Sequence, residues 1–133
     1  MGGTPGPREV VERLVATINA HDPAAGRALF RHDARLVAAT GRVLTLAGLA
    51  RMLSDSVAAF PDLTVRVERW VVDGDTVVTE ELMEGTHGGE FAGLAPTGRP
   101  VRLPMCHLAR VAGGLIVERI AYHDTAGILR QLT

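Results

Sequence analysis

The chain contains very little cysteine: Cys106 is the only one among its 133 residues. An internal disulfide framework is therefore excluded, and a lone thiol fits a reducing cytoplasm, which is the location we predict. No apolar run approaches the roughly 20 residues needed to span a bilayer. The first residues lack the charged-then-apolar pattern of a signal peptide, and we expect residues 1–7 to form a disordered tail.

The sequence also lacks an excess of either charge, with 14 basic and 15 acidic residues. This balance gives no reason to expect nucleic acid or an anionic membrane as a partner. It has no P-loop, no dinucleotide-binding glycine motif and no nucleophile elbow. The potential metal ligands His87, His107, His123 and Asp124 lack the spacing of a metal-binding motif. We therefore predict neither a metal nor a cofactor.

A hydrophobic content of 47% predicts one folded domain over residues 8–133. The first half has helical periodicity, with apolar residues at i, i+3 and i+4 between Val10 and Ile18. A short second helix is expected at 23–30 and a third at 46–60, where Pro61 ends it. A short strand at 36–39 is expected between these two helices.

The second half alternates apolar and polar residues with the period of β-strands. We expect strands from Leu63 to beyond Trp70, then at 76–86, 101–111 and 115–124, followed by a helical turn at 127–132. The alternation changes phase near Trp70, which predicts a bulge or a bend. Three helices followed by an antiparallel meander predict an α+β fold in which a strongly curved sheet and the helices enclose a cone-shaped cavity.

Four segments carry a family resemblance. The connector at 85–99 is similar to the GTHxGxFxGxxPTG segment of the SnoaL-like polyketide cyclases, and 60–63 matches their FPDL junction. The turn at 73–77 matches their GDxV hairpin, and 114–132 resembles their GKIVExWxxxDxxGLLxQL ending. Because the four segments occur in the family's order and cover nearly the whole chain beyond the tail, the chain resembles this family of the NTF2-like superfamily.

The resemblance implies an NTF2-like cone that assembles as a homodimer or homotetramer. It also implies a cofactor-independent cyclase of antibiotic biosynthesis, which closes a ring of a small, hydrophobic aromatic polyketide by an intramolecular aldol reaction. Two alternatives stay open. One is a hydroxylation accessory that acts on the same substrates with a separate reductase. The other is a non-enzymatic module that binds small molecules, since a fold alone does not fix chemistry.

Asp124 matches the aspartate of the family ending and is implied as the catalytic acid/base. By strand parity it shares a face with Ile120 and Tyr122, where partial desolvation would raise its pKa towards that of a general base. The alternative is an aspartate that caps the following turn around Thr125. The same parity points His123 to the opposite face.

His107 shares a face with Met105 and other apolar residues of its strand. We predict that it hydrogen-bonds Asp124 or protonates a developing alkoxide, although a lone histidine on an apolar face is also typical of a hydrogen-bonded core residue. His87 either contacts substrate or ties the connector backbone. The full set of predicted substrate-binding residues is Tyr122, Ile120, Met105, Trp70, Phe60 and His87. Ile120 replaces a family aromatic, which predicts a more apolar pocket.

Overall fold

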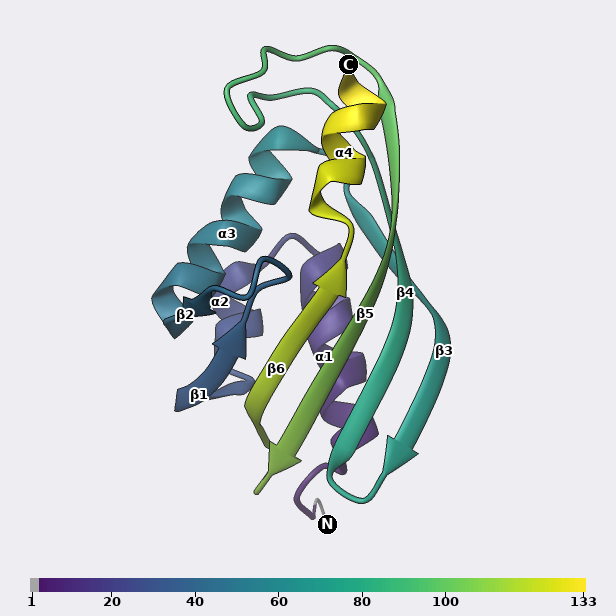
Figure 1. Cartoon of the computed structure of the whole chain (residues 1–133). Coiled ribbons are helices and arrows are strands. Elements are labelled where there is room, and N and C mark those ends of the chain that lie inside the picture. The colour runs from purple at the N-terminus through teal and green to yellow at the C-terminus, as the bar shows by residue number, and fades with distance from the viewer. Residues whose placement is uncertain (1–2) are drawn as a thin grey trace.

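The computed structural model describes residues 3–133, in which helices cover the concave face of one curved, six-stranded sheet (Figure 1). The helices are α1 (Pro7–Asn19), α2 (Pro23–Arg27), α3 (Leu46–Ala59) and α4 (Thr125–Leu132). The strands are β1 (Phe30–Val37), β2 (Val43–Leu44), β3 (Thr64–Asp73), β4 (Thr76–Thr86), β5 (Pro100–Ala112) and β6 (Leu115–His123). This α+β cone confirms the predicted fold class.

The N-terminus was expected to be disordered over residues 1–7. Residues 1 and 2 lie outside the described residues. Thr4 and Pro5 lie close to the turn between β5 and β6, where a Cβ built on Gly114 would be 3.0 Å from Thr4 Cγ2. From Pro7 onward the chain is helical.

Short side chains and prolines set where the helices begin. Pro7 and Pro23 occupy first-turn positions, where the missing N–H costs no hydrogen bond. Thr45 caps α3 by accepting a hydrogen bond from the Gly48 N–H at 3.0 Å. Asp124 caps α4 in the same way, accepting from the Gly127 N–H at 3.1 Å.

The sheet has the strand order β2-β1-β6-β5-β4-β3. All its pairs are antiparallel except β1 with β6, which run parallel. The predicted antiparallel meander is present in β3 to β6, and the parallel pair lies where β1 joins it. Parallel neighbours need a long connection, and here the chain runs through α3 and the meander β3–β5 before β6 returns beside β1. The first strand is also longer than predicted, and α2 ends at Arg27 rather than at residue 30.

β-Bulges in β3 and β6 shift the alternation of side chains between the faces. In β3, Val67 pairs with Glu81 and Arg69 with Glu80, so Glu68 is the extra residue. This confirms the bulge predicted near Trp70. In β6, Ile116 pairs with Val111 and Glu118 with Arg110, so Val117 is extra. Each bulge moves every later side chain of its strand to the other face.

The connector between β4 and β5 is attached to the end of α3. The N–H groups of Gly88 and Gly89 both donate to the carbonyl of Ala59, at 3.0 and 3.1 Å. A Cβ built on Gly89 would lie only 2.1 Å from the carbonyl oxygen of Ala58, so a side chain cannot be accommodated without a backbone shift. Gly98 has φ of +70°, which is the left-handed region that favours glycine.

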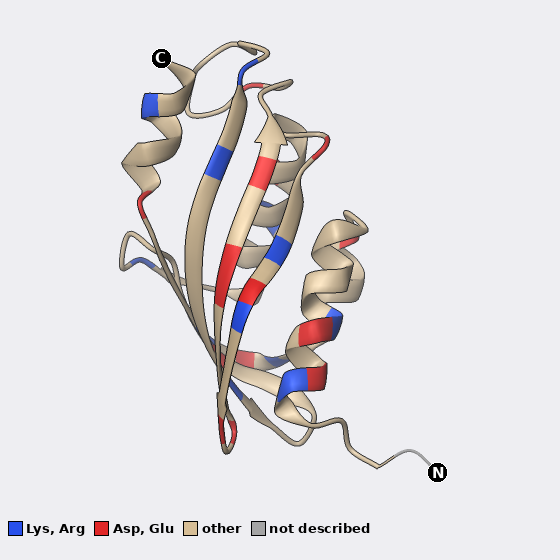
Figure 2. Ribbon diagram, turned by 90° about the vertical axis from the view of Figure 1, so that its right-hand side faces the viewer, with Lys and Arg blue, Asp and Glu red and all other residues tan. Residues whose placement is uncertain are grey.

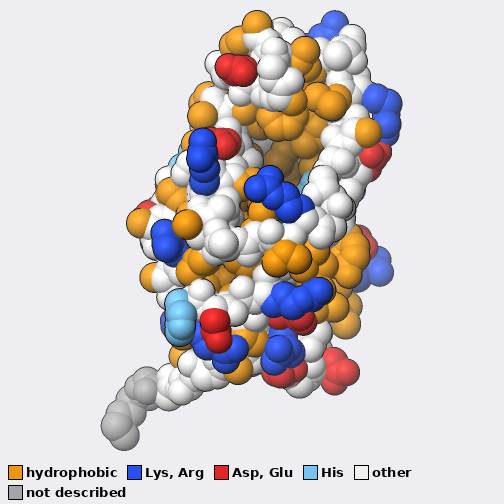
Figure 3. All heavy atoms as spheres, turned by 60° about the vertical axis from the view of Figure 1, so that its left-hand side comes forward, with side chains coloured by type: hydrophobic (Ala, Val, Ile, Leu, Met, Phe, Trp, Pro, Cys, Tyr) orange, Lys and Arg blue, Asp and Glu red, His pale blue; other side chains and the backbone are white. Residues whose placement is uncertain are grey.

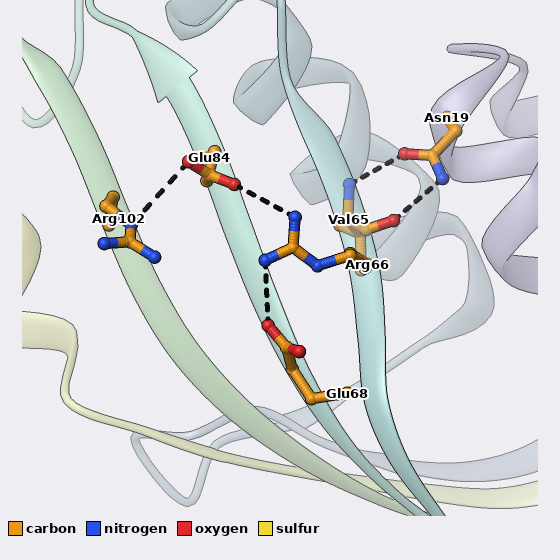
Figure 4. Close-up of polar contacts among 6 residues, drawn as sticks. All are labelled: Asn19, Val65, Arg66, Glu68, Glu84 and Arg102. Atoms are coloured by element: carbon orange, nitrogen blue, oxygen red, sulfur yellow. Dashed lines mark hydrogen bonds and ion pairs between the residues drawn. The ribbon is translucent and has the colours of Figure 1, made fainter.

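The convex face of the sheet is not covered by the helices, and acidic and basic residues occur on its neighbouring strands (Figure 2). Arg66 of β3 bonds Glu68 at 3.0 Å, and Glu84 of β4 lies between Arg66 and Arg102 (Figure 4). On the other side of β3, the amide of Asn19 pairs with both backbone groups of Val65, at 2.9 and 2.7 Å. The end of α1 is thereby fastened to the edge strand of the sheet.

Candidate functional site

A cavity of about 390 Å³ lies between the helices and the concave face of the sheet. Its walls come from α1, α3, α4, β1 to β6 and the loop between β1 and β2, and most are apolar, among them Leu36, Leu49, Met83 and Leu103. Figure 3 shows the hollow, with hydrophobic side chains around it and basic side chains beside it. A space of this size and character suits a small hydrophobic molecule.

Four polar side chains interrupt this apolar lining on three adjacent strands. Glu81 projects from β4, His107 from β5, and Arg119 and His123 from β6. The strand register brings them together, because Met105 of β5 pairs with both Glu81 and His123. Polar groups that converge in an otherwise apolar cavity are typical of a binding or catalytic site.

Glu81 and His107 form a buried hydrogen-bonded pair. Nδ1 of His107 lies 2.6 Å from Oε2 of Glu81, and the two residues are only 6% and 4% exposed. The hydroxyl of Thr79 donates to the same carboxylate oxygen, also at 2.6 Å. A carboxylate that accepts from Nδ1 fixes the imidazole tautomer and leaves Nε2 as the basic nitrogen.

The charges of the cluster follow from burial and from Arg119. Burial, followed by the positive charge of Arg119, lowers the pKa of His107 below 6.5, so the imidazole is neutral at pH 7. Burial alone raises the pKa of Glu81. The hydrogen bond from His107, the charge of Arg119 and the Thr79 hydroxyl outweigh burial and keep this carboxyl ionised, with its pKa below 4.5.

Arg119 and His123 lie four residues apart on β6, and both line the cavity. Burial lowers the pKa of the Arg119 guanidinium, which still stays charged at physiological pH. Burial, followed by the charge of Arg119, also lowers the pKa of His123. Nδ1 of His123 is buried and has no hydrogen-bond partner among residues 3–133.

The cavity contains some of the predicted residues and excludes others. His107 and Met105 line it, as the parity of β5 predicted. Ile120, Tyr122 and Asp124 do not line it, and Tyr122 is 56% exposed. Their predicted placement was wrong, because the bulge at Val117 exchanges the two faces of β6. After the bulge the odd-numbered residues of this strand, rather than the even-numbered ones, point to the concave face. The cavity therefore receives His123, which had been assigned to the opposite face.

Asp124 lies in solvent at the start of α4. Besides capping the helix it pairs with Arg130, and this hydrogen bond and charge lower the pKa of the carboxyl below 3.8. The capping alternative that the sequence left open describes this geometry. A low pKa is the reverse of the upward shift that a carboxylate base needs at neutral pH.

The remaining predicted contacts also lie outside the cavity. Phe60 is buried in the core, with ring centroids 5.8 Å from His87 and 5.4 Å from Phe91. His87 is fully buried and accepts a hydrogen bond from the Thr97 N–H at 3.2 Å, so it ties the connector together. Trp70 packs against the core below the Arg8 guanidinium, which lies 4.7 Å from the ring centroid.

Sequence reasoning missed Glu81 and Arg119. Glu81 shares the parity of Val77, Thr79 and Met83, so a carboxylate on the apolar face of a strand was a readable signal. Arg119 gave no such signal, because the apolar residues of β6 occur at both even and odd positions.

Among residues 3–133, no group of three or more His, Cys, Asp or Glu side chains is placed to hold a metal ion. In the same range no helix is long and apolar enough to cross a membrane.

Comparison with known proteins places the chain within a family. The family model of the SnoaL-like polyketide cyclases matches residues 8–132. IdmH of Streptomyces antibioticus, a proposed polyketide cyclase, is 32% identical with a TM-score of 0.85, over 95% of this chain and 97% of that one. A Catenulispora acidiphila protein with a ketosteroid isomerase-like fold, solved with trimethylamine, is 26% identical with a TM-score of 0.78, over 98% and 94%.

The fold is shared more widely than the sequence. AclR of Streptomyces galilaeus, a proposed hydroxylase, is 24% identical with a TM-score of 0.88, over 95% of this chain and 94% of that one. At this identity the likeness shows the fold alone. No curated protein matches the chain.

Proposed function

Because the chain belongs to the SnoaL-like polyketide cyclase family, we propose that it closes a ring of an aromatic polyketide by an intramolecular aldol reaction in its cavity. The observation that carries this proposal is the buried pair of Glu81 and His107 inside an apolar cavity of about 390 Å³. The pair supplies a neutral imidazole where a planar, hydrophobic substrate would be held.

In the proposed reaction Nε2 of His107 removes a proton from a carbon flanked by carbonyls. The C–H electron pair becomes an enolate, which conjugation spreads over the substrate. The enolate carbon then bonds to the acceptor carbonyl carbon of the same molecule, and the proton on His107 passes to the new alkoxide. No atom is gained or lost, so the product is an isomer of the substrate.

Glu81 acts as a positioning residue in this scheme. Its carboxylate holds Nδ1–H of His107 and stabilises the imidazolium that forms when the proton is taken up. The cavity walls hold the enolate and the acceptor carbonyl close together, which removes much of the entropic cost of arranging them. Asp124, the acid/base implied by the family motif, is the competing assignment, and a direct comparison with His107 tests it.

The expected assembly and location are part of the same proposal. Tyr122 and Val71 are 56% and 52% exposed on the sheet face that the helices leave uncovered, which favours a homodimer or homotetramer formed through this face. The single cysteine favours the cytoplasm. Light scattering coupled to size exclusion would measure the assembly, and a monomeric mass would contradict it.

The activity is tested with an aryl β-ketoester that carries an acceptor carbonyl placed for closure of a six-membered ring. We expect an isomer of unchanged mass by liquid chromatography and mass spectrometry, formed faster than without protein. A product heavier by one oxygen atom, formed only with an added reductase, would instead favour the hydroxylation accessory. Binding without acceleration would favour the ligand-binding module.

A further inference from the structure

The guanidinium of Arg119 has no protein acceptor. It lines the cavity, and among residues 3–133 it takes part in no hydrogen bond or ion pair. Glu81 is the only carboxylate in the cavity lining, but its Oε2 already accepts from His107 and Thr79. Arg119 is half-buried, and a cation without a hydrogen-bonded partner in an apolar lining is unfavourable, so an acceptor supplied by a ligand would be favoured at this position.

The balance of charge in the lining points to the same kind of ligand. Two guanidiniums, those of Arg42 and Arg119, face a single carboxylate, that of Glu81. With His107 and His123 neutral, the lining carries one positive charge in excess. A ligand with one negative charge would neutralise it.

His123 adds a second donor beside Arg119. It lies four residues further along β6, on the same face, and its buried Nδ1 has no partner in the described part of the chain. Buried polar atoms are nearly always hydrogen-bonded, so an orphaned imidazole nitrogen in a cavity is an independent indication of a missing ligand atom. The tautomer with a proton on Nδ1 would offer the ligand a second donor on the cavity wall that carries the guanidinium.

We propose that Arg119, with His123 as a further donor on the same face of β6, forms a receptor for an anionic group conjugated to the ring system of an aromatic ligand. The ligand class is thus an aromatic carboxylate, or an enolate or phenolate of the same charge, rather than a neutral hydrocarbon or ester. This inference rests on the proposed function in taking the cavity as the substrate site. In the aldol reaction the receptor would hold the enolate oxygen, where a fixed positive charge stabilises the developing negative charge.

The experiment compares 2-naphthoate with its uncharged methyl ester by titration calorimetry at pH 7.5. Both probes have the same two-ring body, so the difference isolates the charged oxygen. We expect wild-type protein to bind naphthoate at least roughly tenfold more tightly. Arg119→Met should abolish the preference while ester binding is retained. Arg110→Met, on the convex face of β5, is the matched control and should behave as wild type.

A second measurement reports on the receptor without relying on affinity. The charge of Arg119 lowers the pKa of both His107 and His123, so an anion bound to it should raise both values in NMR titrations. The ester should not raise them. Glu81 on β4 and Arg42 beside β2 are the other charged groups that line the cavity. Both are present in the two titrations, which differ only in the charge of the ligand.

Three results would overturn the proposal. They are equal binding of acid and ester by the wild type, failure of naphthoate to bind, and a preference that survives in Arg119→Met but disappears in Arg42→Met. If Arg119→Met does not fold, Arg119→Lys replaces it and should weaken the preference, since an ammonium lacks the paired donors of guanidinium. These are binding results, so a cyclase that works without the receptor is distinguishable from a receptor without cyclase activity.

Discussion

Nδ1 of His107 lies 2.6 Å from Oε2 of Glu81, with both side chains buried at the wall of the cavity. The distance is short enough for a strong hydrogen bond, and the carboxylate takes a second one from Thr79. The pair is enclosed by apolar residues and lies near the positive charge of Arg119. Burial and charge therefore both favour a neutral imidazole that can accept a proton through Nε2.

The lowered pKa values of His107 and His123 predict how stability depends on pH. Between its lowered pKa and 6.5, each histidine binds a proton in the unfolded chain but not in the folded one. The free energy of unfolding therefore rises with pH through this window and falls as the pH drops below 6.5. We expect the urea midpoint to be lower at pH 5.5 than at pH 7.5.

The control for this prediction is the double variant His107→Gln, His123→Gln, in which the change between the two pH values should be smaller. Asp62 and Asp124 have pKa values below 3.8 and act only under more acidic conditions. A wild-type midpoint that stays constant or rises on acidification would show that these histidines are not held neutral by the fold.

The two bulges explain how far the sequence could predict the site. In β3 the inward-facing apolar residues change from odd positions, Val65 and Val67, to an even position, Trp70. This change made the bulge predictable from the sequence, and the prediction was confirmed. In β6 apolar residues occur in both phases, as in Ile116 and Val117, and no phase change is visible. The bulge there passed unnoticed and exchanged the two faces of the strand.

The unnoticed bulge in β6 exchanged the residues predicted to line the cavity with those predicted to face away from it. The inner face of β6 carries Arg119 and His123, whose polarity is typical of a solvent-exposed face, whereas the outer face carries Ile120 and Tyr122. Polarity alone therefore pointed the wrong way. In β5 the alternation is uninterrupted over the pocket, and the inward direction of His107 could be predicted correctly. The family motifs fixed the fold class because they depend on turns rather than on strand parity.

The close approach of the connector to α3 predicts a strong effect at Gly89. Substitution by alanine would place a methyl group 2.1 Å from the Ala58 carbonyl oxygen and disturb the two hydrogen bonds to Ala59. We expect a loss of about 1–3 kcal/mol or more in the free energy of unfolding, measured with urea. Gly6→Ala is the control, because a Cβ at Gly6 meets nothing within 4 Å. Equal midpoints for the two variants would contradict this account.

Figure 4 contains two kinds of polar contact that should differ in their effect on stability. The Asn19 amide satisfies both backbone groups of Val65 on the edge strand, so Asn19→Ala removes two hydrogen bonds and should cost about 1–2 kcal/mol. Arg66 lies in an exposed ion-pair network, and Arg66→Ala should leave the unfolding free energy nearly unchanged. A larger loss in Arg66→Ala than in Asn19→Ala would reverse this ranking.

The final prediction separates the two candidate bases. His107→Ala removes the only imidazole that Glu81 orients, and general-base removal typically lowers rates by ~10²–10⁴-fold. The loss should appear in kcat more than in KM, because the apolar walls that bind substrate are unchanged. Asp124→Asn keeps a good helix cap for α4 and removes only a solvent-exposed charge, so kcat and the melting temperature should stay close to wild type.

Glu81→Gln completes this comparison, since it keeps a hydrogen-bond acceptor for Nδ1 of His107 but removes the charge that stabilises the imidazolium. The pH at which kcat reaches half its maximum should move, whereas a purely structural role would leave the profile in place. All three variants must unfold cooperatively for the comparison to count. If Asp124→Asn lost activity while His107→Ala kept it, the base would be the aspartate that the family motif implies. The buried pair would then serve only to hold the wall of the cavity.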